Sequence, residues 1–209
     1  MNKKEILSKA KLYVIVDPDL FKHEDLEKVT LQAIEGGADL IQFRDKSSSD
    51  GEFLKLAISL KRITDDKNIP FIINDRVDVA LYLDAAGVHL GQDDLPILAV
   101  RKILGEKRII GISASSLAQA KDAQKNGADY IGVGPVFHTQ TKKVDKPIGL
   151  KLIGDCRKEI RIPFFAIGGI NLDNADEVKK AGIDKIAVVS AVIKAEDPKS
   201  AARRLRDRF

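Results

Sequence analysis

The sequence lacks a long hydrophobic segment, a cysteine pair and tryptophan. No run of about 18 apolar residues occurs in the 209-residue chain, which excludes a membrane-spanning helix. Cys156 is the single cysteine, so no internal disulfide can form, and this predicts a reducing, cytoplasmic location. The first residues, MNKKEILSKA, are basic but carry no apolar segment, so we expect no signal peptide.

A concentration of charge of one sign is also missing. The chain has 35 Lys and Arg against 31 Asp and Glu, a net charge of +4, and the two signs are interspersed. Aromatic residues make up only 5% of the sequence, and none interleaves with a basic patch. Nucleic-acid-binding proteins usually show a basic stripe or tail. The pattern therefore predicts no nucleic-acid partner.

What is present is a repeated short hydrophobic run. Eight β-branched runs occur, at residues 11–17, 39–44, 70–75, 87–91, 109–114, 130–136, 163–170 and 185–192. Each is nearly continuous in apolar residues, which is typical of parallel strands covered on both faces. The runs therefore predict eight parallel strands.

Segments with helical spacing separate these runs. Apolar stripes are formed by residues 54–63, by Leu98, Val100, Ile103 and Leu104, and by residues 117–123, and residues 200–209 predict a last amphipathic helix. Helix–glycine–strand junctions such as EGGADLIQFR and KNGADYIGVG recur along the chain. We expect an α/β fold, a single (β/α)8 TIM barrel that forms one domain over residues 1–209. An open doubly wound sheet is the alternative, but no glycine-rich fingerprint follows the first run.

The ends of the strands carry the chemistry in such a barrel. In the second strand, Gln42, Arg44 and Lys46 project to one side because strand residues alternate between faces. Ile41 and Phe43 project to the other side. If the apolar pair contacts the helices, Gln42 and Arg44 point into the mouth of the barrel. The alternative is a strand end that merely becomes solvated.

Carboxylates follow the next two strands. Asp75 comes directly after the third strand, and Asp94 follows the fourth in GVHLGQDD. Oxygen ligands on neighbouring loops suit Mg²⁺, which keeps several waters and shares its site with phosphate oxygens. The pair predicts a magnesium site, with capping of the next helix by Asp93 or Asp94 as the competing interpretation.

The last four strands end in small and hydroxyl residues. Ser113 ends the fifth strand, and Gly132 and Gly134 in the sixth leave space for a ligand. Thr139, Thr141 and Lys142 follow on a polar loop. Gly168 and Gly169 after the seventh strand, with Val189 and Ser190 after the eighth, predict a phosphate cradle. A tight turn is the other reason for such glycines.

The sequence shows no convincing nucleophile–base pair. Cys156 is expected to be a packing residue, His89 a hydrogen-bonded core residue and His23 an exposed one, whereas His138 lies where it can contact a ligand. The expected site has two anion pockets and one metal but no strong base. Such a site is suited to a reaction in which a phosphate-type leaving group departs. It does not suit acyl hydrolysis.

Seven motifs at strand ends carry a resemblance to a known family. They are QFRDK, INDRVDVAL, GVHLGQDD, GIS, GADYIGVGPVFHTQTKK, AIGGI and VSA. In this order and spacing, over about residues 11–193, the chain resembles the thiamine-phosphate synthase (thiamine-phosphate pyrophosphorylase) family. The resemblance implies a Mg²⁺-dependent transferase of thiamine biosynthesis on a (β/α)8 barrel. It joins 4-amino-2-methyl-5-hydroxymethylpyrimidine diphosphate to 4-methyl-5-(2-phosphoethyl)thiazole, with release of pyrophosphate.

The resemblance also assigns roles to matching residues. The pyrimidine diphosphate is expected to contact Gln42, Arg44, Lys46, Asn74, Ser113 and Lys142, and Mg²⁺ is expected at Asp75 and Asp94. The thiazole phosphate is expected to contact Thr139, Thr141, Gly169, Val189 and Ser190. Catalysis is expected from Arg44, Lys46, Ser113 and Lys142. Two residues depart from the family pattern: Asp45 stands where glutamate is frequent, and His138 where proline is common.

The chemistry explains these residue types. The bond to the leaving diphosphate can break first, because the aminopyrimidine stabilises the resulting pyrimidinylmethyl cation, which the thiazole nitrogen then captures. Cations near the leaving group stabilise its growing negative charge, and no base is needed to activate the nitrogen. A thiazole tautomerase and a non-catalytic phosphate sensor are the rival functions on the same barrel. The sequence leaves the oligomeric state open, including a homo-oligomer.

Overall fold

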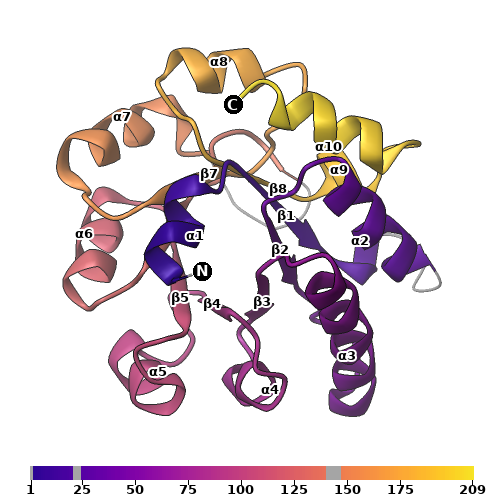
Figure 1. Ribbon diagram of the computed structural model, residues 1–209. Coiled ribbons are helices and arrows are strands. Elements are labelled where there is room, and N and C mark those ends of the chain that lie inside the picture. Colours follow the sequence, from indigo (N-terminus) through magenta and orange to yellow (C-terminus); the bar gives the residue numbers. More distant parts are fainter. Residues whose placement is uncertain (1, 21–24, 140–146) are drawn as a thin grey trace.

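A closed barrel of eight parallel strands, in chain order, forms the centre of the molecule (Figure 1). This computed structural model describes residues 2–20, 25–139 and 147–209. The strands are β1 (Leu12–Val16), β2 (Leu40–Phe43), β3 (Phe71–Asn74), β4 (Gly87–Leu90), β5 (Ile109–Ala114), β6 (Tyr130–Val133), β7 (Phe164–Ile167) and β8 (Ile186–Val188). The predicted (β/α)8 architecture is confirmed, and the pairing of β1 with β8 closes it.

The last three strands are shorter than predicted. The ladder of β6 stops before Gly134 and Pro135, and proline has no N–H with which to extend it. Gly168 and Gly169 follow β7 at φ 97° and 68°, which is not strand geometry. Val189 already caps the helix after β8. Hydrophobic runs therefore continue beyond the strands, into the loops at the mouth of the barrel.

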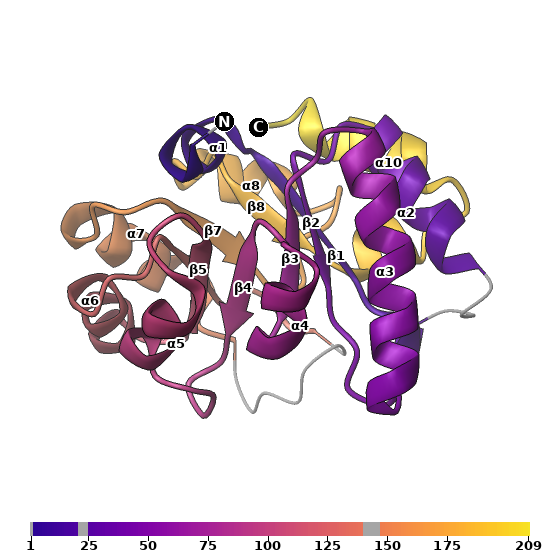
Figure 2. The same cartoon turned by 60° about the horizontal axis from the view of Figure 1, so that its bottom comes forward.

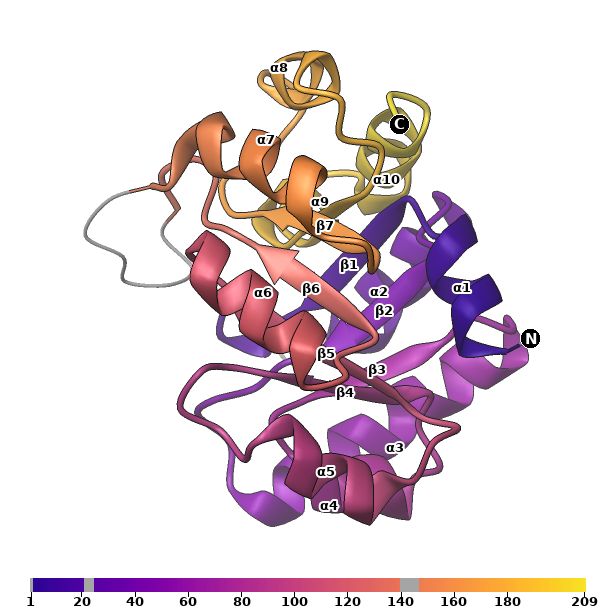
Figure 3. The ribbon, with the colours of Figure 1, turned by 90° about the vertical axis from the view of Figure 1, so that its left-hand side faces the viewer.

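Helices surround the strands on the outside, except α1 (Lys3–Lys9), which lies at one end of the barrel (Figure 2). The helices are α1, α2 (Leu26–Glu35), α3 (Asp50–Asp66), α4 (Val77–Tyr82), α5 (Ile97–Leu104), α6 (Leu117–Lys125), α7 (Gly149–Glu159), α8 (Ala175–Lys180), α9 (Ser190–Ile193) and α10 (Pro198–Arg206), and a short 3-10 turn, η1, spans Pro18–Leu20. Figure 3 shows α6 and α7 side by side on the outer surface, where they are in contact. No helix within the described ranges is long and apolar enough to cross a membrane.

The apolar face predicted for α5 is confirmed at Val100 and Leu104 and wrong at Leu98 and Ile103. Leu98 and Ile103 are 61% and 48% exposed, whereas Ile97, Val100 and Leu104 are buried. The buried residues follow an i, i+3, i+7 spacing, which keeps them on one side of a helix. In α10 the predicted inward face is confirmed, because Ala202 and Leu205 are fully buried.

Alternation along each strand separates two apolar layers. Ile41 and Phe43 of β2 belong to the layer between strands and helices. Leu40 belongs to the layer inside the barrel. That inner layer is formed by Tyr13, Ile15, Leu40, Ile72, Ile109, Tyr130, Phe165 and Ala187. Gln42 shares the inward face with Leu40 and is 2% exposed, as predicted from its position.

The N-terminal end of the barrel is covered by α1 (Figure 2). Leu7 of this helix is buried and packs with the inner layer, a contribution of about 1.5–3 kcal/mol for a fully buried side chain of this size. Asn2 caps the helix by accepting a hydrogen bond from Glu5 N at 2.9 Å. The buried polar residues Gln42 and Asn74 lie in the last two positions of β2 and β3, toward the opposite end of the barrel.

Candidate active site

An ion pair joins the ends of β1 and β2. The Arg44 guanidinium donates a hydrogen bond to Asp17, whose side chain is almost completely buried. Burial raises the pKa of the Asp17 carboxyl above its ordinary value, although the neighbouring Arg44 charge opposes the shift. The sequence prediction missed Asp17. The signal was available, because Ile15 pairs with Gln42, and two residues further on in each strand bring Asp17 beside Arg44.

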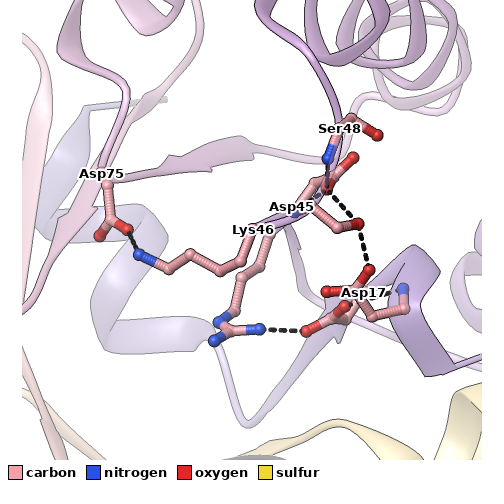
Figure 4. A network of polar contacts seen from close by, with 8 residues as sticks. Asp17, Asp45, Lys46, Ser48 and Asp75 are labelled. Atoms are coloured by element: carbon pink, nitrogen blue, oxygen red, sulfur yellow. Dashed lines mark hydrogen bonds and ion pairs between the residues drawn. The ribbon is translucent and has the colours of Figure 1, made fainter.

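Two carboxylates and a lysine meet after β2, β3 and β4. Lys46 Nζ donates to the Asp75 carboxylate, and Figure 4 shows the lysine side chain extended toward it. The Asp75 and Asp94 carboxyls are close enough for each to shift the pKa of the other. Gly91 N also donates to Asp94 Oδ2 at 2.6 Å. The predicted convergence of Asp75 and Asp94 is therefore confirmed.

The competing interpretation of Asp94 as a helix cap is wrong. The residue at the N-cap of α5 is Pro96, and no side chain caps this helix. Asp94 instead folds back on its own loop to Gly91. Its carboxylate is thereby held at the barrel end, facing Asp75.

The two carboxyls affect each other's pKa in opposite directions. Burial raises the pKa of Asp75, and the neighbouring Asp94 carboxyl adds to this, while Lys46 lowers it. Burial also acts on Asp94, but hydrogen bonds from Asp75 and from Gly91 N outweigh it, so the pKa of Asp94 lies below its ordinary value. Like charges this close favour a shared proton. A cation placed between the carboxyls would replace that proton.

This donor set fits a hydrated divalent cation. Within the described residues, no cluster of three or more His, Cys, Asp or Glu side chains forms a complete metal cage. Mg²⁺ is usually held by one or two carboxylates, with water and phosphate oxygens completing its shell. Asp75 and Asp94 offer two such carboxylates beside a cationic Lys46.

The loop after β2 is shaped by its own aspartate. Asp45 Oδ1 accepts hydrogen bonds from the backbone N–H groups of Ser47 and Ser48, each at 3.0 Å. Figure 4 shows Asp45 and Ser48 at this turn. Asp45, which stands where glutamate is frequent in the family, is therefore a residue that stabilises the turn of this loop.

The structure brings together a histidine and a serine that the sequence did not suggest as a pair. His89 Nε2 lies 3.0 Å from Ser113 Oγ, and His89 Nδ1 lies 2.8 Å from the Tyr130 hydroxyl. The prediction that His89 is a buried, hydrogen-bonded residue is confirmed. Its orienting partner is a buried tyrosine, and burial raises the pKa of Tyr130 well above its ordinary value. Tyr130 therefore stays neutral and provides no anion to stabilise an imidazolium, unlike the carboxylate of a hydrolase triad.

Two further residues lie at the same end of the barrel. Asn74, which was predicted, ends β3 and is 9% exposed. Gln92, which the prediction did not assign to the site, donates from Nε2 to the Ser113 carbonyl oxygen at 2.7 Å. This bond ties the loop after β4 to β5 and holds the Ser113 backbone in place.

The glycines after β6 and β7 have a packing role that the sequence did not reveal. A Cβ at Gly134 would lie 2.2 Å from the carbonyl oxygen of Ile167, so no space for a ligand exists there, contrary to the prediction. A Cβ at Gly168 would lie 2.4 Å from Pro135 Cβ, and one at Gly169 would lie 2.4 Å from the His138 carbonyl oxygen. Close approach of these two loops requires glycine on its own account.

Some of the remaining predicted residues lie at the strand ends, and others lie outside the described residues. Thr139 is partly buried, and Val189 and Ser190 lie directly after β8. Thr141 and Lys142 lie outside the described residues, as does His23. His138 is exposed on the loop after β6. Cys156 is buried in α7, which confirms its packing role.

Comparison with known proteins agrees with this arrangement. Thiamine-phosphate synthases from Ruminiclostridium cellulolyticum and Clostridium beijerinckii are 48% and 46% identical to the chain over 198 residues, covering 95% of the chain and 94% and 95% of the relatives. The solved structure of thiamine phosphate pyrophosphorylase from Pyrococcus furiosus is 43% identical and superposes with a TM-score of 0.88, covering 97% of this chain and 96% of the other. A family model described as thiamine monophosphate synthase matches residues 12–192. The chain therefore belongs to the thiamine monophosphate synthase family.

Proposed function

We propose that residues 1–209 form one catalytic domain that acts as a thiamine-phosphate synthase. In this reaction 4-amino-2-methyl-5-hydroxymethylpyrimidine diphosphate and 4-methyl-5-(2-phosphoethyl)thiazole give thiamine monophosphate and pyrophosphate. The main support is the Lys46–Asp75–Asp94 cluster, which lies beside the Arg44–Asp17 pair at the end of a family barrel. The buried single cysteine agrees with a reducing cytoplasm.

The proposed chemistry is dissociative. The bond between the methylene carbon and the diphosphate oxygen breaks with its electron pair going to the diphosphate. The pyrimidinylmethyl cation that is left is captured by the lone pair of the thiazole nitrogen. In this proposal Arg44 and Lys46 stabilise the charge on the departing diphosphate, which their ion pairs at the end of the barrel support, and by resemblance Lys142 joins them.

Asp75 and Asp94 are the residues that would hold Mg²⁺. When bound, Mg²⁺ supplies Lewis-acid stabilisation of the leaving group. Lys46 now pairs with Asp75, and a bound diphosphate would compete for the same ammonium group. In this proposal the lysine exchanges its carboxylate partner for a substrate oxygen. The thiazole phosphate is assigned to Thr139, Thr141, Gly169, Val189 and Ser190 by resemblance.

A coupled assay tests this function. Both substrates are mixed with the protein and Mg²⁺, and pyrophosphate release is followed with and without a chelator. Release that depends on both substrates and stops with the chelator supports the proposal. Isomerisation of a thiazole phosphate without pyrophosphate would identify a tautomerase, and a thermal shift with thiazole phosphate but no turnover would identify a sensor. The Lys46–Asp75–Asp94 cluster argues against both, because neither function needs a diphosphate and metal site.

A further inference from the structure

A chain of hydrogen bonds crosses the inside of the barrel between two residues assigned to the pyrimidine substrate. Gln42 Nε2 donates to the Tyr13 hydroxyl at 2.6 Å, and the Tyr13 and Tyr130 hydroxyls are 2.9 Å apart. From Tyr130 the chain continues through His89 Nδ1 at 2.8 Å and from His89 Nε2 to Ser113 Oγ at 3.0 Å. We call these five residues the polar relay.

The barrel interior is built around this relay. A Cβ at Gly111 would lie 2.1 Å from Tyr130 Cζ, so only glycine leaves room for that ring. A Cβ at Gly132 would lie 3.3 Å from His89 Cε1. The Tyr13 and Tyr130 rings meet edge to face with centroids 5.9 Å apart. These contacts hold the relay residues in one arrangement.

Each relay hydroxyl has a single hydrogen to donate. Burial raises the pKa of Tyr13 and of Tyr130, so both remain neutral. A neutral imidazole donates from one ring nitrogen and accepts at the other. Consequently, once the direction of one hydrogen bond is set, the direction of all the others follows.

Two directions are available. In the first, Gln42 Nε2 donates to Tyr13, the tyrosines donate onward to His89 Nδ1, and His89 Nε2–H donates to Ser113. Gln42 Oε1 is then left as an acceptor, and Ser113 keeps its hydrogen for another acceptor. In the second direction, the Gln42 amide is flipped and every hydrogen bond reverses. Ser113 then donates its hydrogen to His89 Nε2.

We propose that the polar relay couples recognition of an amino group at Gln42 to hydrogen-bond donation by Ser113. The inference rests on the proposed function, because it takes the aminopyrimidine diphosphate as the ligand. An amino N–H donated to Gln42 Oε1 sets the first direction. Ser113 then directs its hydrogen at an oxygen of the diphosphate, where negative charge grows. Tyr13, Tyr130 and His89 are positioning residues.

Through the relay, the substrate's amino group affects two contacts: its own hydrogen bond to Gln42 and the hydrogen bond from Ser113 to the diphosphate. A pyrimidine with a carbonyl oxygen in place of the amino group needs a donor from Gln42, which sets the second direction. Ser113 then accepts rather than donates, and it repels the diphosphate oxygen. Discrimination against the oxo analogue therefore exceeds what one mispaired contact at Gln42 would produce.

Removal of one relay hydroxyl tests the coupling. Tyr130→Phe keeps the ring but breaks the relay, and Tyr13→Phe breaks it one bond earlier. The matched control is Thr30→Val, which removes a buried hydroxyl that bonds to the Leu26 carbonyl oxygen in α2. For each variant, kcat and KM are measured with the amino substrate and with its oxo analogue, and thermal melting checks folding.

We expect Tyr130→Phe to lower kcat for the amino substrate roughly tenfold, with KM changed less than about threefold, because a single hydrogen bond affects orientation by this order. The ratio of amino to oxo kcat/KM should fall at least fivefold in both tyrosine variants and stay constant in Thr30→Val. Because Tyr13→Phe carries the same expectation, loss of folding in one variant leaves the test intact. A ratio that stays within twofold of the wild type in a folded tyrosine variant overturns the relay.

The tautomer of His89 gives a readout that needs no turnover. In ¹⁵N NMR spectra of histidine-labelled protein, with His89 identified by His89→Gln, saturation with the pyrimidine diphosphate should show Nε2 protonated and Nδ1 unprotonated. Tyr130→Phe should abolish this preference, and protonation of both nitrogens in the wild type would overturn the relay. A set tautomer without pyrophosphate release would defeat the proposed function alone. Pyrophosphate release with an unset tautomer would defeat the relay alone.

Discussion

The Arg44 guanidinium donates a hydrogen bond to the buried Asp17 carboxylate, which ties the end of β2 to the end of β1. This ion pair restricts the orientations that the Arg44 side chain can adopt. The guanidinium presents its remaining N–H groups in a set direction at the end of the barrel. Preorganised donors of this kind lose little free energy to reorganisation when charge develops on a leaving group.

Release of Arg44 should therefore slow the chemical step. We expect Asp17→Asn to lower kcat for pyrophosphate release about tenfold, because a neutral amide holds the guanidinium less firmly. Steady-state kinetics measure the effect. Glu35→Gln, which removes the partner of Lys199 on the outer surface, is the control and should leave kcat unchanged. Equal kcat values for Asp17→Asn and the wild type would show that Arg44 needs no anchor.

Asp17 should also leave a signature in the dependence of stability on pH. Burial raises its folded-state pKa above the ordinary value of 3.8, so the folded state binds this proton more readily than the unfolded state. Its contribution to the free energy of unfolding is therefore fully present below about pH 3.8 and is lost as pH rises through the folded-state pKa.

Urea unfolding of the wild type and Asp17→Asn across this range measures the contribution. The free energy of unfolding of the wild type relative to the variant should fall as pH rises and then become constant. A difference that rises with pH would mean that Arg44 outweighs burial.

The paired carboxylates should control metal binding. Asp75→Asn and Asp94→Asn should each weaken Mg²⁺ binding at least tenfold in calorimetry and slow pyrophosphate release by about 10²–10³, a typical loss for one preorganised electrostatic contact. Asp84→Asn is a matched control, because Asp84 also has a positive φ, 50° against 59° for Asp75, and asparagine tolerates this geometry. Unchanged Mg²⁺ affinity in both site variants would place the metal elsewhere.

Lys142 is assigned by resemblance and lies outside the described residues. We expect Lys142→Ala to slow turnover by roughly 10²–10³ while the protein stays folded, since its ammonium group would stabilise the leaving group. Turnover together with circular dichroism separates the two effects. Near-wild-type turnover would remove Lys142 from the mechanism.

A single methyl group added beside the ring of Tyr130 should lower the stability of the protein. Gly111→Ala would place Cβ 2.1 Å from Tyr130 Cζ, and overpacking of this kind typically costs about 1–3 kcal/mol of unfolding free energy. Gly154→Ala in α7 is the control, because a Cβ added there would have no neighbour within 4 Å, and it should be neutral or stabilising by about 0.5–1 kcal/mol. Denaturant unfolding of both variants measures the contrast. Equal stabilities would mean that the ring of Tyr130 shifts at no cost.

Local patterns were sufficient to predict much of this protein. The eight strands, the inward direction of Gln42 and the meeting of Asp75 with Asp94 all follow from alternation along parallel strands in chain order. These are properties of single strands and of sequential neighbours, so a sequence pattern contains them. The Asp17–Arg44 pair belongs to the same class, although it was missed.

Contacts across the closed barrel were beyond any local pattern. Tyr13 and Tyr130 come from β1 and β6, which are not adjacent, and their hydroxyls meet only because closure brings opposite walls of the barrel together. The His89–Ser113 pair joins the neighbouring strands β4 and β5, and Ile167 of β7 fills the space beside Gly134 after β6. These two contacts depend on the side-chain and loop conformations at the strand ends, which alternation along a strand does not determine. Residue types in a strand determine which face a side chain occupies, whereas the register around the whole barrel decides which partner it finds there.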